Sequence, residues 1–337
     1  MHRVATVSRC PSSAATIPAF ALLLASSVAA IAPLTAIAQT PAWPAKPVRV
    51  IFPYPPGGGT DAVGRIATNA LTEQLGQTFI VDTRPGASGQ IGTEVASKSP
   101  ADGYTLVLGN VAPLAILPAS NPKLPYDPLR DLAPISLIAT SDYILTVHPS
   151  LPVKNLKDLL ALARKRPGEL SFASSGSLGG PHLAGELLNL LGGVDVLHVP
   201  YKGNGPAVVA VLSGEATMLY GTGPAVVPFA QQGRMRIIAT TGLKRTIKDV
   251  PSIAETINDF QVTQWYGLLA PAGTPREIID RLAKETARAV ANPNNAAALV
   301  KLGAEPMSNS PADFRRFIES EIARYTKVVK AAKLTAQ

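Results

Sequence analysis

The sequence has 337 residues, of which 46% are hydrophobic and 16% charged, and its formal net charge is +8. This composition is typical of a folded globular protein rather than a disordered chain, and the length predicts two domains. The basic residues are scattered and have no aromatic residues interleaved with them, which argues against a nucleic-acid partner. The single cysteine, Cys10, cannot form a disulfide within the chain or a thiolate metal site alone.

The first 38 residues differ in character from the rest. A basic start leads into an uncharged stretch, 14–38, that ends with Ala36-Ile37-Ala38. This pattern predicts a secretory signal peptide over residues 1–38, and therefore a periplasmic protein. A membrane anchor is the alternative, because the stretch is long enough to span a bilayer, but its prolines weaken it as a helix.

The chain after this segment alternates predicted strands and helices. Strands are predicted at 48–52, 79–82 and 105–108. A helix with apolar residues along one face begins near Asp61 and ends at Gly76. We expect residues 84–92 to form a Gly-rich loop. The alternation predicts an α/β fold with a mainly parallel sheet.

A second unit repeats this plan. Helices are predicted from Leu156 and from Pro181, which takes the first helical position. The tail is helical, because Thr274 to Glu277 reads as a capping box and Ser310 as the start of a last helix. Further strands are predicted at 170–173, 196–199 and 236–240.

Three consecutive glycines, Gly57, Gly58 and Gly59, lie between a predicted strand and a predicted helix. They let a ligand approach the backbone closely, and the first N–H groups of a helix have no partner within it. The helix dipole adds positive charge, so that this end suits a carboxylate or phosphate. Thr60 or Asp61 is the predicted N-cap. The alternative is a tight turn that needs glycine, although three glycines exceed what a turn requires.

A second loop has the same layout and more hydroxyl groups. Ser174, Ser175 and Ser177 follow a predicted strand, and Pro181 and His182 open the next helix. His182 either contacts the ligand or only hydrogen-bonds a neighbour, and the loop itself has the alternative of an ordinary polar connection. Two such loops, one in each domain, predict a cleft with two anion-accepting ends.

Enzyme motifs are weak in this sequence. Gly57-x-Gly59-x-x-Ala62, with Asp82 further on, matches the relaxed dinucleotide-binding fingerprint and keeps a nicotinamide-dependent oxidoreductase as a rival. Pro55 and Pro56 stiffen that turn, and an exported protein meets little of this cofactor.

No nucleophile elbow, phosphate-loop lysine or paired acid and base stands out. His148, His182 and His198 are not spaced as zinc ligands. We therefore predict no cofactor, no metal and no catalytic residue.

Taken in order, many segments resemble the Bug receptors, the TctC-like solute-binding proteins of tripartite tricarboxylate transporters. The resemblance covers nearly all of the chain after the signal segment. It rests on Trp43 to Pro47, Pro55-Pro56-Gly57-Gly58-Gly59-Thr60-Asp61, Arg84-Pro85-Gly86-Ala87, Asp102-Gly103-Tyr104-Thr105-Leu106, Leu124-Pro125-Tyr126-Asp127-Pro128, Ser175-Gly176, His182-Leu183-Ala184-Gly185-Glu186, His198-Val199-Pro200-Tyr201-Lys202-Gly203, Asp249-Val250-Pro251 and residues 268–275.

The resemblance implies a type II periplasmic-binding-protein fold, in which two α/β domains joined by two crossover strands surround a ligand cleft. The crossovers are expected near 139–143 and 264–267. Domain I would comprise residues 39–140 plus 266–337, and domain II residues 141–265.

In the family, the strand-to-helix loop of each domain holds a ligand carboxylate, partly through bridging waters. This puts Gly57 to Thr60 and Ser174 to Ser177 at the ligand. The resemblance adds Tyr54, Asn110, His182 and Tyr201 as neighbours.

The expected function is an extracytoplasmic receptor that captures a small carboxylate for uptake through the membrane subunits of a tripartite transporter. A receptor that senses its ligand for a signalling system is the alternative. We expect a monomer. Relatives carry acidic or Asn residues near the position of Gly221 and Thr222, which offer no charge here, so we expect no preference for an amino acid.

Overall fold

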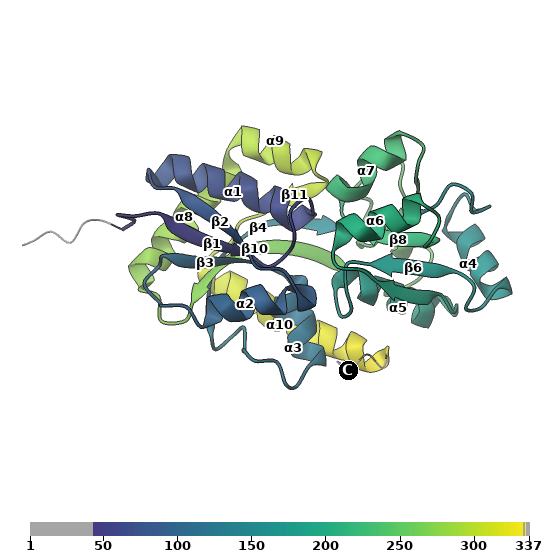
Figure 1. Cartoon of the computed structure of the whole chain (residues 1–337), viewed down its shortest axis with the longest axis horizontal. Helices are drawn as coiled ribbons and strands as arrows, with labels where there is room; N and C mark the ends of the chain where they lie inside the picture. The colour runs from purple at the N-terminus through teal and green to yellow at the C-terminus, as the bar shows by residue number, and fades with distance from the viewer. Residues whose placement is uncertain (1–42, 333, 335–337) are drawn as a thin grey trace, which may run out of the picture. The chain divides into compact units, whose positions relative to one another are not determined.

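The structure is a computed structural model that describes residues 43–332 and Leu334. The predicted signal peptide over residues 1–38 lies outside the described residues and stays a prediction. Within them, no helix combines the length and the apolar character that crossing a membrane requires. The described chain forms two β-sheets, each with helices packed on both of its faces (Figure 1).

The first sheet has six strands in the order β11-β4-β10-β3-β1-β2. Strand β1 pairs in parallel with β2 and β3. Strand β10 runs antiparallel to β3 and β4, and β11 antiparallel to β4. The bounds are β1 Val48–Phe52, β2 Phe79–Thr83, β3 Thr105–Asn110, β4 Leu132–Asp142, β10 Thr263–Pro271 and β11 Ala304–Pro306.

Helices cover both faces of this sheet, because successive side chains of a strand point to opposite faces and both sets are apolar. On one face α1, α8 and α9 pack against Val50 and Leu106. On the other face α2, η2 and α10 pack against Ile51 and Val107. The bounds are α1 Gly59–Leu75, η1 Ala87–Gly89, α2 Gln90–Ser97, η2 Ala112–Ile116, α3 Leu117–Ser120, α8 Arg276–Ala291, α9 Pro293–Lys301 and α10 Pro311–Ala331.

The second sheet has five strands in the order β7-β6-β8-β5-β9. Strand β6 is parallel to β7 and β8, whereas β5 is antiparallel to β8 and β9. Helices α4 and α5 cover Phe172 and Tyr220 on one face, and α6 and α7 cover Ala173 and Leu219 on the other. The bounds are α4 Leu156–Lys165, β5 Ile144–Val147, β6 Ser171–Ser174, α5 Gly180–Gly192, β7 Leu197–Pro200, α6 Asn204–Leu212, β8 Met218–Gly221, α7 Gly223–Gln231, β9 Arg236–Thr240 and η3 Ile253–Glu255.

The chain passes between the two sheets at two neighbouring points. Tyr143 alone separates β4 of the first sheet from β5 of the second. The return leads from β9 into β10, and Thr241 ties the two passages together. Its Oγ1 accepts a hydrogen bond from the Tyr143 N–H at 2.9 Å and donates to the carbonyl of Val262 at 2.6 Å. Val328 of α10 packs against the cores of both sheets.

The prediction of a mainly parallel sheet is wrong, because both sheets are mixed. The long strands β4 and β10 carry the chain between the sheets and run antiparallel to each other within the first. Residues 84–92 are also not only a loop, since they contain η1 and the start of α2.

The predicted helix starts are also corrected at three points. Gly58, not Thr60 or Asp61, is the N-cap of α1. Pro275 is the N-cap of α8 and carries no side-chain cap, so the predicted capping box does not form. The hydroxyl of Thr274 instead donates to the Pro271 carbonyl at 2.8 Å. Pro181 follows Gly180 in the first turn of α5, which begins one residue earlier than predicted.

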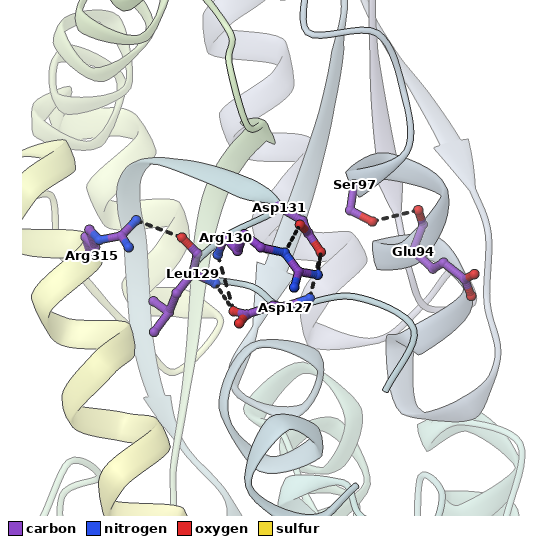
Figure 2. Close-up of polar contacts among 7 residues, drawn as sticks. All are labelled: Glu94, Ser97, Asp127, Leu129, Arg130, Asp131 and Arg315. Atoms are coloured by element: carbon purple, nitrogen blue, oxygen red, sulfur yellow. Dashed lines mark hydrogen bonds and ion pairs between the residues drawn. The ribbon is translucent and has the colours of Figure 1, made fainter. Parts of the chain in front are cut away.

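The connection between α3 and β4 is fixed to the last helix by polar contacts, which Figure 2 shows. The Asp127 carboxylate accepts hydrogen bonds from the backbone N–H groups of Leu129 and Arg130, at 2.8 and 3.2 Å. The guanidinium of Arg315 in α10 donates to the Leu129 carbonyl at 2.9 Å. An Arg130–Asp131 ion pair at 2.7 Å completes the group. The segment before β4 is therefore held both by its own aspartate side chains and by Arg315 of α10.

Candidate functional site

A cavity of about 90 Å³ lies where loops that follow strands of both sheets meet. The first sheet supplies the loop after β1 and the end of β3. The second sheet supplies the loops after β6, β7 and β8. Tyr143 and Gln264, from the two passages between the sheets, also line it. The carboxyl ends of strands are the usual position of ligand sites in α/β proteins.

The N-terminus of α1 forms one wall of this cavity, through Gly58, Gly59 and Thr60. A side chain at Gly58 would meet no atom within 4 Å. A side chain at Gly59 would meet the hydroxyl of Tyr266 at 2.4 Å. The two glycines therefore serve different purposes, since Gly58 leaves room in the cavity and Gly59 permits close packing against β10.

Asp61 and Gly57 do not line the cavity. The Asp61 carboxylate accepts a hydrogen bond from the Gly57 N–H at 3.2 Å and pairs with Arg65 at 2.8 Å. The Asp61 carboxylate therefore holds the glycine loop in place without lining the cavity. Asp61 is the third residue of α1, so its carboxylate reaches back past the N-cap Gly58 to the N–H of Gly57.

A network of amide and hydroxyl groups supports the same wall. The amide of Asn110, at the end of β3, donates to Thr60 Oγ1 at 3.2 Å and its Oδ1 accepts from the Ala112 N–H at 3.1 Å. The hydroxyl of Tyr54 donates to the Ser88 carbonyl at 2.7 Å and lies 3.2 Å from Asn110 Oδ1. Burial raises the pKa of Tyr54, so the phenol stays protonated.

The N-terminus of α5 forms the opposite wall, through Gly179, Gly180 and Pro181, with Ser175 beside it. A side chain at Gly180 would meet the Tyr143 hydroxyl at 2.1 Å. Glycine at this position lets the start of α5 lie directly against the passage between the sheets.

Two stacked histidines support this second wall on the side away from the cavity. Ser174 is fully buried, and its Oγ lies 2.6 Å from His198 Nε2. The rings of His198 and His182 stack with centroids 3.8 Å apart. His182 Nδ1 accepts a hydrogen bond from the Leu178 N–H at 3.0 Å. Burial, together with the neighbouring His182, lowers the pKa of His198 to about 4. Ser174 and His182 therefore hold the loop in place and do not line the cavity.

Two more helices begin at the cavity, and the sequence reading missed both. Gly203 is the N-cap of α6 and Thr222 the N-cap of α7, and both residues line the cavity. The amide of Asn204 lies 3.5 Å from Thr222 Oγ1 and links the two. The available signal was a proline in the first turn, Pro206 or Pro224, which repeats the pattern of α5.

None of these four helices, α1, α5, α6 and α7, has a side-chain N-cap. Among the described residues that line the cavity, none is acidic, and Lys202 is the one with a charged side chain. Free N–H groups, four dipole ends and a lysine favour an anion. The described residues hold no group of His, Cys, Asp and Glu that could bind a metal ion.

A second cavity of about 440 Å³, called the outer cavity, adjoins the first, which is called the inner cavity. Ser177 and Tyr201 line it, and Tyr54, Ser88 and Ser175 line both. Of the residues named from the sequence, the structure places Tyr54, Gly58, Gly59, Thr60, Asn110 and Ser175 around the inner cavity.

The comparisons with known proteins agree with this geometry. The chain matches the family described as "Tripartite tricarboxylate transporter family receptor" over residues 63–334. It is 36% identical over 305 residues to Protein BugT of Bordetella pertussis, an alignment that covers 89% of this chain and 94% of BugT.

Two solved structures are similar over most of the chain. R. palustris Rpa4515 with adipate has a TM-score of 0.84 and 35% identity, covering 87% of this chain and 99% of that chain. The periplasmic binding protein BugD has a TM-score of 0.83 and 28% identity, covering 88% of this chain and all (100%) of that chain. The expected two-domain periplasmic-binding-protein fold is therefore confirmed. The chain belongs to the receptor family of the tripartite tricarboxylate transporters.

Proposed function

We propose that this protein is a periplasmic receptor that binds a small carboxylate in the inner cavity and performs no chemistry on it. The observation that carries the proposal is the meeting of four uncapped helix N-termini at one cavity with no acidic side chain in its lining. Each terminus presents N–H groups that a carboxylate oxygen can accept from. The similarity to a protein with adipate supports the same ligand class.

The cavity favours a plain carboxylate over an amino acid. An ammonium group needs an acceptor, best an acidic one, and the lining contains no aspartate or glutamate among the described residues. Thr222 contributes a hydroxyl and no carboxylate to the lining, and Lys202 would repel a cation. A dicarboxylate, in contrast, can place one carboxylate at the α1 wall and the other at the α5 wall.

The division into domains fits a closing cleft. We propose domain I as residues 39–140 plus 266–337 and domain II as residues 141–265, with hinges near Tyr143 and at the start of β10. Closure would bury the ligand and replace its water with fixed donors. The proposed partners are the membrane subunits of a transporter. The alternative is that the ligand-bound receptor acts on a signalling system.

Isothermal titration calorimetry of the purified protein tests the ligand class. The panel is malonate, malate, adipate, citrate and aspartate, with adipamide as the uncharged match of adipate and NAD as the dinucleotide. We expect at least one carboxylate to bind with a micromolar Kd, and adipamide and aspartate to bind at least 100-fold more weakly or not at all. Binding of NAD with none of the carboxylates would refute the proposal.

A further inference from the structure

Ser88 makes a direct hydrogen bond across the cleft. Its Oγ donates to the carbonyl of Ser177 at 2.7 Å, between residues 89 apart in sequence. Ser88 lies in η1, between β2 and α2 beside the first sheet, and Ser177 lies in the loop before α5 beside the second. Ser88 also lines both the inner and the outer cavity, so this bond lies at the boundary between them.

The backbone around this bond is strained on both sides. Ala87 and Ser88 have φ of 46° and 52°, and Leu178, next to Ser177, has φ of 57°. Residues with a β-carbon rarely adopt this left-handed conformation, and strained positions of this kind concentrate at ligand clamps and switches. Glycine would adopt it without strain but would have no hydroxyl.

The position of Ser88 is tied to the wall of the inner cavity. The Ser88 carbonyl accepts the hydrogen bond of the Tyr54 hydroxyl at 2.7 Å. Opposite, a side chain at Gly176 would lie 3.1 Å from Ser88 Oγ, so this glycine leaves room for the hydroxyl. A change that fills or widens the inner cavity near Tyr54 would therefore move Ser88 relative to Ser177.

We infer that Ser88 and Ser177 form a latch that sets the length of carboxylate which the receptor retains. The inference rests on the proposed function. A carboxylate short enough to lie wholly in the inner cavity lets the latch close and leaves slowly. A longer homologue extends into the outer cavity, holds Ser88 away from Ser177, and leaves quickly. Ser88 is thus a positioning residue that acts on specificity through dissociation.

Dissociation rates over a chain-length series test the latch. The probes are the linear dicarboxylates from malonate to suberate, followed by stopped-flow displacement. In S88A we expect the retained short ligands to dissociate about tenfold faster, because the net free energy of one hydrogen bond is lost. The association rate constant should change less than about twofold. The longest ligands that bind should show no change in dissociation rate.

Two further variants separate the latch from loop stability. S88G removes the hydroxyl but relieves the strain, so it should raise the dissociation rate as S88A does while the unfolding midpoint does not fall. S97A is the matched control, because Ser97 Oγ donates only to the Glu94 carbonyl within its own segment, at 2.9 Å (Figure 2). Equal dissociation rates in wild type, S88A, S88G and S97A would overturn the latch.

A measurement without ligand separates failure of the latch from failure of the proposed function. Spin labels at E73C on α1 and V209C on α6, in a C10S background, report the distance between the two domains. We expect S88A, but not S97A, to shift the distribution towards longer distances. If no carboxylate binds the wild type, the proposed function fails. The distance between the spin labels then shows by itself whether the Ser88–Ser177 bond holds the two domains together. An unchanged distribution in S88A would then refute the latch.

Discussion

The four helices that begin at the cleft differ from three that begin elsewhere, α4, α9 and α10. Asn155, Asn292 and Ser310 cap α4, α9 and α10, each accepting a hydrogen bond from a backbone N–H of the first turn. The four helices at the cavity begin at Gly58, Gly179, Gly203 and Thr222 without any side-chain cap. A cap satisfies the end of the helix locally, whereas an uncapped end remains available for a ligand. A missing cap alone does not make a site, since α8 also begins without one; what distinguishes the cleft is that four uncapped ends meet at one cavity.

The largest test of this comparison is Gly58→Val. The side chain enters open space at φ −94°, a conformation that valine accepts, so the fold should keep its stability. It also covers the N–H groups at the start of α1. We expect carboxylate affinity to fall more than about 100-fold, or roughly 3 kcal/mol, by calorimetry.

The neighbouring Gly59→Ala provides the contrast to Gly58→Val. Its new methyl group would meet the buried Tyr266 hydroxyl at 2.4 Å, so overpacking should lower the free energy of unfolding by about 1–3 kcal/mol. If G58V bound its carboxylate with wild-type affinity, the uncapped end of α1 would have no part in binding.

Low pH should destabilise the wall of the cavity at α5 and leave the wall at α1 unaffected. An unfolded histidine has a pKa of about 6.5, whereas burial lowers the pKa of His198 in the fold to about 4. Between these values the unfolded chain binds a proton that the fold does not. The free energy of unfolding is therefore unaffected by His198 above about pH 6.5 and falls as the pH falls towards 4. The loss amounts to about 2 kcal/mol after solvent screening.

Urea unfolding from pH 7 to pH 4 measures this effect. H198Q should flatten the decline, whereas H148Q should leave it unchanged, since the side chain of His148 bonds only Ser150. Hydrogen exchange at pH 5 should rise in the loop before α5 and not in the loop before α1. Equal rises in both loops would mean that the histidine stack does not support the second wall specifically.

A smaller effect is expected at a capped helix. Removing the cap of α4 with Asn155→Ala leaves the Asp158 N–H without its partner at 3.0 Å. The free energy of unfolding should fall by about 1 kcal/mol in urea, with no change in carboxylate affinity. Loss of affinity in N155A would break the distinction between helices that serve the fold and helices that serve the ligand.

The sequence predicts the site only where local signals coincide. The glycine run before α1 and the serine loop before α5 were visible, because a strand, small residues and a helix follow one another directly. Helices α6 and α7 were missed because their apolar residues do not mark a single face, as in Val208 to Val211. The Ser88–Ser177 bond joins residues 89 apart, and no local pattern encodes it. The mixed sheets escaped prediction for the same reason, because strand direction depends on where the chain crosses.

The smallest expected effect concerns charge at the cavity. Lys202 is exposed at the rim and lines both cavities, so it should attract an anion before the cleft closes more than it holds it afterwards. In K202Q we expect carboxylate association to slow about threefold at low ionic strength, with the difference lost in about 0.5 M salt. Dissociation should be unchanged, since the helix ends provide the bound contacts. K284Q removes the same charge from exposed α8 and is the matched control. A faster dissociation in K202Q would instead place the ammonium among the contacts of the closed state, and the cavity would then depend on a side-chain charge as well as on uncapped helices.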